Sequence, residues 1–130
     1  MIEDTSFVID LLHDVSDAVD YLEVVEKDNR PEKVASITVL ELYEAVPQLD
    51  VPDDRQQQIL DVLDTRHAIP ADERIMRKAG KISGELRARG EEIDREDCII
   101  GATALLSDEP VVTRNVDHFS RIDGLAVETY

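Results

Sequence analysis

The chain opens with Met1-Ile2-Glu3-Asp4-Thr5-Ser6-Phe7-Val8-Ile9-Asp10-Leu11-Leu12, and this stretch decides which fold we expect. Its pattern predicts a very short strand that ends at Asp4, followed by a helix whose first turn is capped by the hydroxyl of Thr5 or Ser6. In open α/β sheets, ligands bind beside the carboxyl ends of the strands, where Asp4 would lie. Asp is also a common helix cap, so Asp4 is expected either to line a crevice or only to begin the helix.

Helical and strand patterns alternate along the rest of the chain. After the first helix, which ends near residues 13–14, helices are expected at 15–27, 39–46, 55–63, 71–89, 93–106 and 116–121, and strands at 34–38, 66–70, 110–115 and 125–128. A loop is expected between Pro47 and Pro52, and the last strand is expected at a sheet edge. This alternation predicts an α/β sandwich with a mainly parallel sheet. The length suits a single domain over residues 1–130.

Acidic residues dominate the composition, because 30 Asp and Glu against 14 Lys and Arg give a formal net charge of −16. The acids are spread over every expected element rather than gathered in one tail. Such a balance repels nucleic acid and anionic membranes at ordinary ionic strength. At about 1 M salt, however, the screening length is only about 3 Å, and the net charge no longer decides what binds. We therefore expect a protein of a halophilic cytoplasm.

Several other classes of protein and site are excluded by the sequence. Apolar residues make up 42% of the chain but never form a run near the roughly 20 residues that a membrane helix requires. The N-terminal stretch lacks the basic and then apolar pattern of a signal peptide, which favours a cytoplasmic protein. Cys98 is the one cysteine, so no internal disulfide is expected, and the three histidines are too far apart in sequence for a typical zinc site.

Two further carboxylates are candidates for a site. Glu41 follows Thr38 by three residues, which is the spacing of a capping box, and the alternative is that Glu41 points into the same crevice as Asp4. Asp97 is the last charge before the small and apolar body of the helix expected at 93–106. The helix dipole explains its acidic neighbours well, but a charge at the edge of a buried segment needs a partner.

A third polar group, Thr113-Arg114-Asn115, follows the strand expected near the end of the chain and would lie at the same sheet edge. Two carboxylates about 4 Å apart repel by roughly 4 kcal/mol at an effective dielectric constant near 20, so such a cluster needs a cation. Ligands that are all oxygen favour Mg²⁺ or Mn²⁺, which often complete their coordination with water and substrate phosphate. That arrangement supports hydrolysis of a phosphodiester.

Four segments in this order resemble the PIN-domain family, and in particular its VapC-type toxins. They are residues 2–12, the helix that carries Glu41, the run Asp97-Cys98-Ile99-Ile100-Gly101-Ala102-Thr103-Ala104, and the run Val112-Thr113-Arg114-Asn115-Val116-Asp117-His118-Phe119. The resemblance covers essentially the whole chain. It implies a three-layer α/β/α sandwich and a Mg²⁺-dependent endoribonuclease, with Mn²⁺ as an alternative metal. It also implies an RNA substrate, a cognate VapB-type antitoxin and a homodimer.

The resemblance also assigns roles to individual residues. Asp4, Glu41 and Asp97 match the acidic metal ligands of the family. Thr5 or Ser6 would orient Asp4 or a metal-bound water, and Thr113 belongs with them as a supporting or substrate-contacting residue.

The fourth acidic position departs from the family pattern, because Asn115 stands where many PIN domains have Asp. His118 precedes Phe119 where others have Asp, which leaves Asp117 as the nearest carboxylate. Either Asp117 fills the fourth catalytic position, or the site works with three carboxylates and an amide. Arg114 contacts phosphate or forms a surface salt bridge.

Two other functions compete with that of a toxin. One is a housekeeping PIN nuclease that matures RNA, which the sequence does not separate from a toxin. The other is a PIN-fold module that binds RNA or protein without cutting, which the missing fourth acid and the acidic surface favour.

Overall fold

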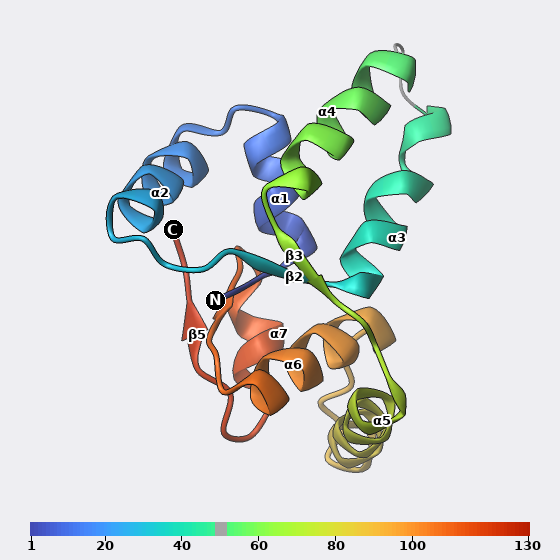
Figure 1. Cartoon of the computed structure of the whole chain (residues 1–130). Helices are drawn as coiled ribbons and strands as arrows, with labels where there is room; N and C mark the ends of the chain where they lie inside the picture. The colour runs from blue at the N-terminus through green and yellow to red at the C-terminus, as the bar shows by residue number, and fades with distance from the viewer. Residues whose placement is uncertain (49–51) are drawn as a thin grey trace.

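A parallel five-stranded sheet forms the centre of the computed structural model, which describes residues 1–48 and 52–130 (Figure 1). The strands lie in the order β3-β2-β1-β4-β5, and each neighbouring pair is parallel. All are short: β1 Ile2–Glu3, β2 Lys33–Ala35, β3 His67–Ile69, β4 Val111–Val112 and β5 Val127–Glu128. The expected α/β fold with a parallel sheet is confirmed, and β5 lies at an edge as predicted.

Helices cover both faces of the sheet, with α1 to α4 on one side and α5 to α7 on the other (Figure 1). Their bounds are α1 Thr5–Leu12, α2 Ser16–Lys27, α3 Ser36–Glu44, α4 Pro52–Asp64, α5 Glu73–Ala88, α6 Arg95–Ser107 and α7 Val116–Ser120, with a 3₁₀ turn at Val46–Gln48. No helix among the described residues is long and apolar enough to span a membrane.

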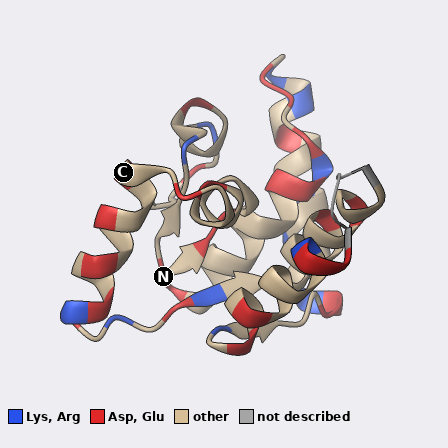
Figure 2. Ribbon diagram, turned by 90° about the horizontal axis from the view of Figure 1, so that it is seen from above, with Lys and Arg blue, Asp and Glu red and all other residues tan. Residues whose placement is uncertain are grey.

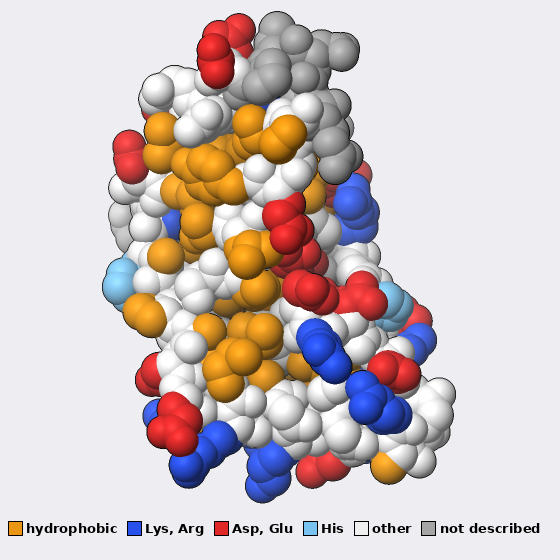
Figure 3. Space-filling model, turned by 90° about the vertical axis from the view of Figure 1, so that its right-hand side faces the viewer, with side chains coloured by type: hydrophobic (Ala, Val, Ile, Leu, Met, Phe, Trp, Pro, Cys, Tyr) orange, Lys and Arg blue, Asp and Glu red, His pale blue; other side chains and the backbone are white. Residues whose placement is uncertain are grey.

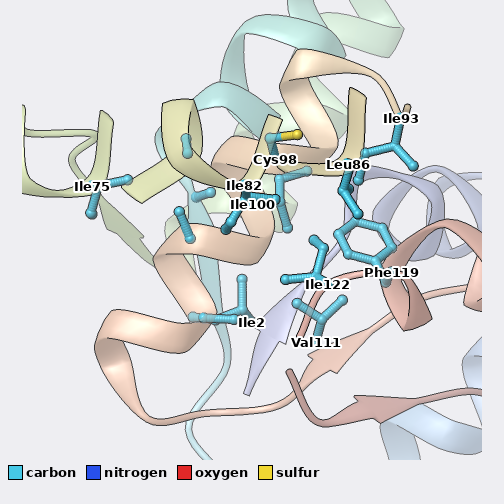
Figure 4. Packing of buried hydrophobic residues seen from close by; sticks show 14 residues of the cluster. Ile2, Ile75, Ile82, Leu86, Ile93, Cys98, Ile100, Val111, Phe119 and Ile122 are labelled. Carbon is cyan, nitrogen blue, oxygen red and sulfur yellow. The ribbon is translucent and has the colours of Figure 1, made fainter. Parts of the chain in front are cut away.

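Alternation along each short strand sends consecutive side chains into opposite layers. Ile2 and Val111 belong to the core shared with α5, α6 and α7. Val112, which follows Val111 on β4, and Val34 of β2 pack in the cores on the side of the sheet covered by α1 to α4. Figure 4 shows the larger core, in which Ile2, Ile82, Leu86, Ile100, Phe119 and Ile122 lie close together. Burial on both faces explains why strand residues read as apolar runs rather than as alternating patterns.

The long helix α5 follows its sequence signals closely. Its expected core stripe of Ile75, Ala79, Ile82 and Leu86 is buried. Asp72 caps its first turn by accepting a hydrogen bond from the backbone N–H of Ile75, and Gly90 follows its end. With a φ of 72°, Gly90 adopts the left-handed conformation that most other residues disfavour, so the helix ends where the sequence predicts.

The topology places a crevice at the carboxyl ends of β1 and β4. From β1 the chain proceeds to β2 and β3 on one side of the sheet, and it then returns to form β4 and β5 on the other side. The strand order therefore reverses between β1 and β4, which is where open α/β sheets bind ligands. Glu3 of β1 is in register with Val112 of β4, so the residues that follow, Asp4 and Thr113, leave the sheet side by side.

Several local predictions were wrong in extent or position, including the strand expected at 125–128, which is Val127–Glu128, and the helix expected at 39–46, which is Ser36–Glu44. The strand expected at 34–38 is Lys33–Ala35, and the helix already begins at Ser36; the strand expected at 110–115 is Val111–Val112. β2 pairs with β1 over two residues and with β3 over three, and it ends because α3 begins at Ser36; β4 pairs with β1 and with β5 over two residues each. Neither Thr5 nor Ser6 caps α1, because both lie inside the helix and Asp4 occupies the N-cap position; the side chain of Asp4 makes no capping hydrogen bond.

The loop expected between Pro47 and Pro52 is only partly described. Pro47 belongs to the 3₁₀ turn, and Pro52 begins α4, in keeping with the preference of proline for the first turn of a helix. Residues 49–51 of that expected loop lie outside the described residues.

Charged residues are distributed over the surface as the sequence predicts. Figure 2 shows Asp and Glu on helices around the molecule rather than in one tail. The most deeply buried ion pair of the described residues joins Arg66, with 4% of its side chain exposed, to the fully buried Glu3 of β1, and Arg66 also lies 2.9 Å from Glu32. Most other ion pairs of the described residues involve at least one exposed side chain, as in the pair of Arg77 with Glu73.

Candidate active site

A cleft of about 390 Å³ opens at the carboxyl ends of β1 and β4. Its lining combines four carboxylates with hydroxyl, amide and guanidinium groups from distant parts of the chain. The described lining residues are Asp4, Thr5, Ser6, Ile9, Glu41, Asp94, Asp97, Arg114 and Asn115. The structure therefore brings together Asp4, Glu41 and Asp97, the three carboxylates that the resemblance assigns to the site.

Two hydroxyl groups hold Asp4, which is 4% exposed. Its Oδ2 atom accepts a hydrogen bond from Ser6 Oγ at 2.7 Å and another from Thr113 Oγ1 at 2.7 Å. The backbone N–H of Asp4 also donates to the carbonyl of Val112. With the backbone and one carboxylate oxygen fixed, the Oδ1 atom has no hydrogen-bond partner among the described residues and is available to a ligand.

Glu41 does not form the capping box with Thr38. The N-cap of α3 is Ala35, so Thr38 lies inside the helix, and its buried hydroxyl is 3.0 Å from the Thr5 hydroxyl. Thr5 Oγ1 donates to Oε1 of Glu41 at 2.8 Å. The side chain of Glu41 is thus directed to the start of α1 and lines the cleft, which favours the crevice alternative over the capping alternative.

The carboxylates raise one another's proton affinity. Burial is the main cause that raises the pKa of Glu41 from 4.5 to about 7; donation by Thr5 opposes the shift, and the charges of Asp4 and Asp97 add to it. Burial also raises the pKa of Asp97 from 3.8 to about 6, with a further contribution from Asp4. The contact of Asp97 with His118 opposes its shift, but burial outweighs that contact. Carboxylates with raised pKa values are a common feature of functional clefts.

His118 is a site residue that sequence reasoning missed. Its Nδ1 atom lies 3.3 Å from Oδ2 of Asp97 and 2.8 Å from Nδ2 of Asn115. The signal that was available is the spacing of three residues between Asn115 and His118 in a helical turn, with Phe119 buried as its anchor. His118 thereby links the carboxylate at the start of α6 to the amide that follows β4.

The remaining candidates, Arg114, Asn115 and Asp117, differ in whether they line the cleft. Asn115 lines the cleft, and its backbone N–H donates to the Thr113 hydroxyl at 2.8 Å. Asp117 does not line the cleft: its side chain is 80% exposed and pairs with Arg121 at 2.8 Å. Arg114 lines the cleft and forms an ion pair with Asp10 at 2.6 Å, so both interpretations offered for Arg114 stay compatible with its position.

The donor set fits a hard divalent cation. Among the described residues, no three or more His, Cys, Asp or Glu side chains form a group that could hold a metal ion by themselves. Mg²⁺ does not require such a group, because it usually keeps several waters and takes only one or two carboxylates from the protein. Carboxylate oxygens with raised pKa values in an open cleft match this mode of binding.

Comparison with known proteins adds three findings. The model of the PIN domain family matches residues 1–125 of the chain. Ribonuclease VapC1 of Methanocaldococcus jannaschii is 27% identical over 122 residues, which make up 92% of this chain and 86% of that protein. The fold is shared with a chain of VapBC2 from Rickettsia felis bound to a DNA fragment from its promoter, at a TM-score of 0.89 and 22% identity, over 99% of this chain and 97% of that one.

A second solved structure agrees with the first. A chain of FitAcB from Neisseria gonorrhoeae is 25% identical, with a TM-score of 0.82, and the match covers 97% of this chain and 94% of that chain. The family model covers the opening strand, the carboxylates Asp4, Glu41 and Asp97, and the polar segment after β4. The chain belongs to the PIN domain family.

Proposed function

We propose that the protein is a Mg²⁺-dependent endoribonuclease and the toxin of a type II toxin–antitoxin pair. One observation carries the proposal: Asp4, Glu41 and Asp97, from three separate elements, line one cleft at the switch point of the sheet. Membership of the PIN domain family supports a nuclease, and the relative named Ribonuclease VapC1 supports RNA as the substrate.

In this proposal, Asp4, Glu41 and Asp97 would hold the metal ion, which is Mg²⁺ or Mn²⁺, with one or two of them in direct contact and the rest acting through bound water. When bound, the ion activates water and stabilises the charge that develops on the phosphate oxygens. Ser6 and Thr113 keep Asp4 in place, and Thr5 keeps Glu41 in place, through the hydrogen bonds described above.

We assign the fourth position to the amide of Asn115 rather than to the carboxylate of Asp117. Asn115 lines the cleft and contacts His118, whereas Asp117 is exposed and paired with Arg121. The site then has three carboxylates and one amide, so its negative charge is lower than that of a site with four acids. This favours one metal ion over two.

Cleavage of a mixed RNA substrate in molar KCl tests the proposal. The parent and Asp4→Asn would each be incubated with Mg²⁺ and with chelator, and Asp117→Asn serves as a matched control outside the cleft. We expect cleavage by the parent and by Asp117→Asn that requires Mg²⁺, and none by Asp4→Asn although its fold is intact. Metal-independent cleavage or an inactive parent would contradict the proposal and favour the non-cleaving binding module.

The partner in the cell is proposed to be a VapB-type antitoxin. The structures that share the fold include VapBC2 of Rickettsia felis and a DNA-bound VapBC of Salmonella typhimurium. Expression of the protein in a cytoplasm should arrest growth, and the product of a neighbouring gene should relieve the arrest. Normal growth on expression, together with RNA cleavage in vitro, would instead favour a housekeeping nuclease that matures RNA.

We also propose a homodimer. Leu40 and Met76 are 49% and 47% exposed, and a groove of about 300 Å³ between α5 and α6 continues from Met76 along Gly80 and Gly84. A Cβ atom at either glycine would meet nothing within 4 Å. Figure 3 shows apolar side chains gathered on this face of the molecule. A second copy would remove them from water.

Light scattering coupled to size-exclusion chromatography tests the dimer. We expect a mass of two chains for the parent and of one chain for Met76→Glu, since a carboxylate would then face the apolar surface of the other copy. Val24→Glu is the matched control, because Val24 is also exposed, at 58%, but lies on α2. A monomeric parent would contradict the proposal.

A further inference from the structure

Arg114 is the one basic residue among the described residues that line the cleft, where it faces four carboxylates. Any polyanionic substrate that enters must approach this acidic surface, so the position of the single guanidinium matters. The side chain of Arg114 is 60% exposed. A long exposed side chain is normally mobile, and mobility weakens a contact because ordering the chain costs entropy.

Asp10 restricts Arg114 to one side of the cleft. Asp10 lies on α1, its side chain is 5% exposed, and its Oδ1 atom accepts a hydrogen bond from Nη1 of Arg114 at 2.6 Å. Arg114 is also held at its backbone, where its N–H donates to the hydroxyl of Ser6 at 3.3 Å. The Nε and Nη2 groups of Arg114 have no hydrogen-bond partner among the described residues, so they are free to bind an anion.

Tyr130 in turn holds Asp10. The Tyr130 hydroxyl donates to Oδ2 of Asp10 at 2.6 Å, so each oxygen of this carboxylate has one donor. The ring of Tyr130 packs edge-on against Phe7, with centroids 4.9 Å apart, and against Tyr21. The aromatic cluster therefore fixes the hydroxyl, the hydroxyl fixes the carboxylate, and the carboxylate fixes the guanidinium.

We propose that Asp10 and Tyr130 are positioning residues that hold Arg114 ready to bind a phosphate group of the RNA next to the metal site. This inference rests on the proposed nuclease function, and it names the part of the substrate that Arg114 recognises. A planar guanidinium with free N–H groups is suited to phosphate, with which it forms charge-assisted hydrogen bonds. Because the guanidinium binds the phosphate in the substrate and in the transition state alike, its contribution falls on KM rather than on kcat.

The aromatic cluster supplies a matched pair of variants. Tyr130→Phe and Tyr21→Phe each remove one hydroxyl that donates to a carboxylate, and both rings pack against Phe7. The hydroxyl of Tyr21 bonds Glu128 on β5 and has no contact with Asp10. Only Tyr130→Phe therefore removes a contact to Asp10, the residue that holds Arg114.

The experiment measures kcat and KM for cleavage of an RNA oligonucleotide in the presence of Mg²⁺. The proteins compared are the parent, Arg114→Ala, Tyr130→Phe, the double variant that combines these two changes, and Tyr21→Phe. We expect KM to rise about tenfold or more in Arg114→Ala and about threefold to tenfold in Tyr130→Phe, with kcat within about twofold of the parent. Tyr21→Phe should match the parent. The double variant should match Arg114→Ala, because Tyr130 acts through Arg114.

Additive effects in the double variant, or equal behaviour of Tyr130→Phe and Tyr21→Phe, would overturn the inference. A second measurement tests the inference separately from the proposed nuclease function. Dissociation constants for the same oligonucleotide are measured by fluorescence anisotropy in the Asp4→Asn background, where no cleavage is expected. An inactive parent with the expected order of affinities would reject the nuclease and retain the role of Tyr130. An active parent whose variants lack that order of affinities would retain the nuclease and reject the role of Tyr130.

Discussion

The hydroxyl of Thr113 donates to Oδ2 of Asp4 at 2.7 Å, although the two residues are 109 positions apart in the chain. Both are buried, and they follow the neighbouring strands β4 and β1. The contact connects the candidate metal ligand nearest the N-terminus to the last polar segment of the cleft. It also fills one of the two carboxylate oxygens, which leaves Asp4 with a defined orientation toward the cleft.

Replacing Thr113 by Val should lower both activity and stability. Valine keeps the shape of threonine but leaves the buried carboxylate of Asp4 with only the donor from Ser6. We expect a loss of about 1–3 kcal/mol in the free energy of unfolding, because a hydrogen bond to a charged group is removed, and a fall in kcat. Urea denaturation and RNA cleavage measure the two effects. Thr113→Ser should restore both; equal loss in the serine and valine variants would show that packing rather than the hydroxyl matters.

In the metal-free protein, the pH dependence of stability should depend on the cleft carboxylates Glu41 and Asp97. The pKa values of Glu41 and Asp97, about 7 and about 6, lie above the usual 4.5 and 3.8, so the folded state binds protons more tightly than the unfolded state. Their contribution is therefore fully present below about pH 4 and is lost as the pH rises through 6 and 7. After allowance for solvent screening, the loss is roughly 1 kcal/mol for each group.

Thermal melts in chelator should accordingly show Tm falling between about pH 5 and pH 8. Mg²⁺ should raise Tm at pH 8 and have little effect at pH 5, because protons compete for the same oxygens. Glu41→Gln is the control and should flatten the decline in chelator. The same pH dependence of Tm in Glu41→Gln as in the parent would show that Glu41 does not cause the decline.

The fourth position of the site can be tested by two conservative changes. Asp117→Asn should change cleavage by less than about twofold, because this exposed side chain contacts Arg121 and surface ion pairs contribute little. Asn115→Ala should reduce kcat about tenfold or more, because it removes the amide that lines the cleft and contacts His118. The opposite order would assign the fourth position to Asp117.

The buried ion pair of β1 and Arg66 should be essential for stability. Arg66→Met leaves the fully buried Glu3, the neighbour of Asp4, without its main cationic partner. We expect a loss of about 3–5 kcal/mol in the free energy of unfolding. Arg77→Met is the matched control, because Arg77 and its partner Glu73 are 77% and 79% exposed, and the expected change is below about 0.5 kcal/mol. Similar losses in both variants would contradict this account.

Salt should stabilise the protein strongly if it belongs to a halophilic cytoplasm. The net charge of −16 is spread over the helices, so carboxylates repel one another across the surface at low ionic strength. We expect Tm to rise by about 10 °C or more from low KCl to molar KCl, as screening reduces this repulsion. A fold equally stable in both conditions would reject the halophilic hypothesis.

Much of the site could be predicted because its carboxylates follow local rules. Asp4 ends a strand and Asp97 begins a buried helix, and both positions are recognisable within a few residues of sequence. Glu41 had two interpretations of equal standing, since a capping box and a crevice carboxylate share the same local spacing. The contact with Thr5, 36 positions away, separates them, and no local pattern contains that contact.

The parts that escaped prediction depend on tertiary contacts. The strand expected at 34–38 is shorter because α3 already begins at Ser36, which the β-branched residues Ile37 and Thr38 do not reveal. His118, Asp10 and Tyr130 reach the site only through partners from other elements. The sequence neighbourhoods of Asp10 and Tyr130 carry no signal of these partners, and that of His118 shows its spacing from Asn115 but not its contact with Asp97.

The clamp on Asp4 has a consequence for synthesis of the protein in the cell. Asp4 is synthesised 109 residues before Thr113, whose position depends on the later strand β4. A nascent chain therefore carries Asp4 and Glu41 well before β4 and Thr113 can complete the cleft. A chain whose synthesis stops before β4 therefore has no Thr113 to hold Asp4, and the cleft can act as one unit only after this segment has been made.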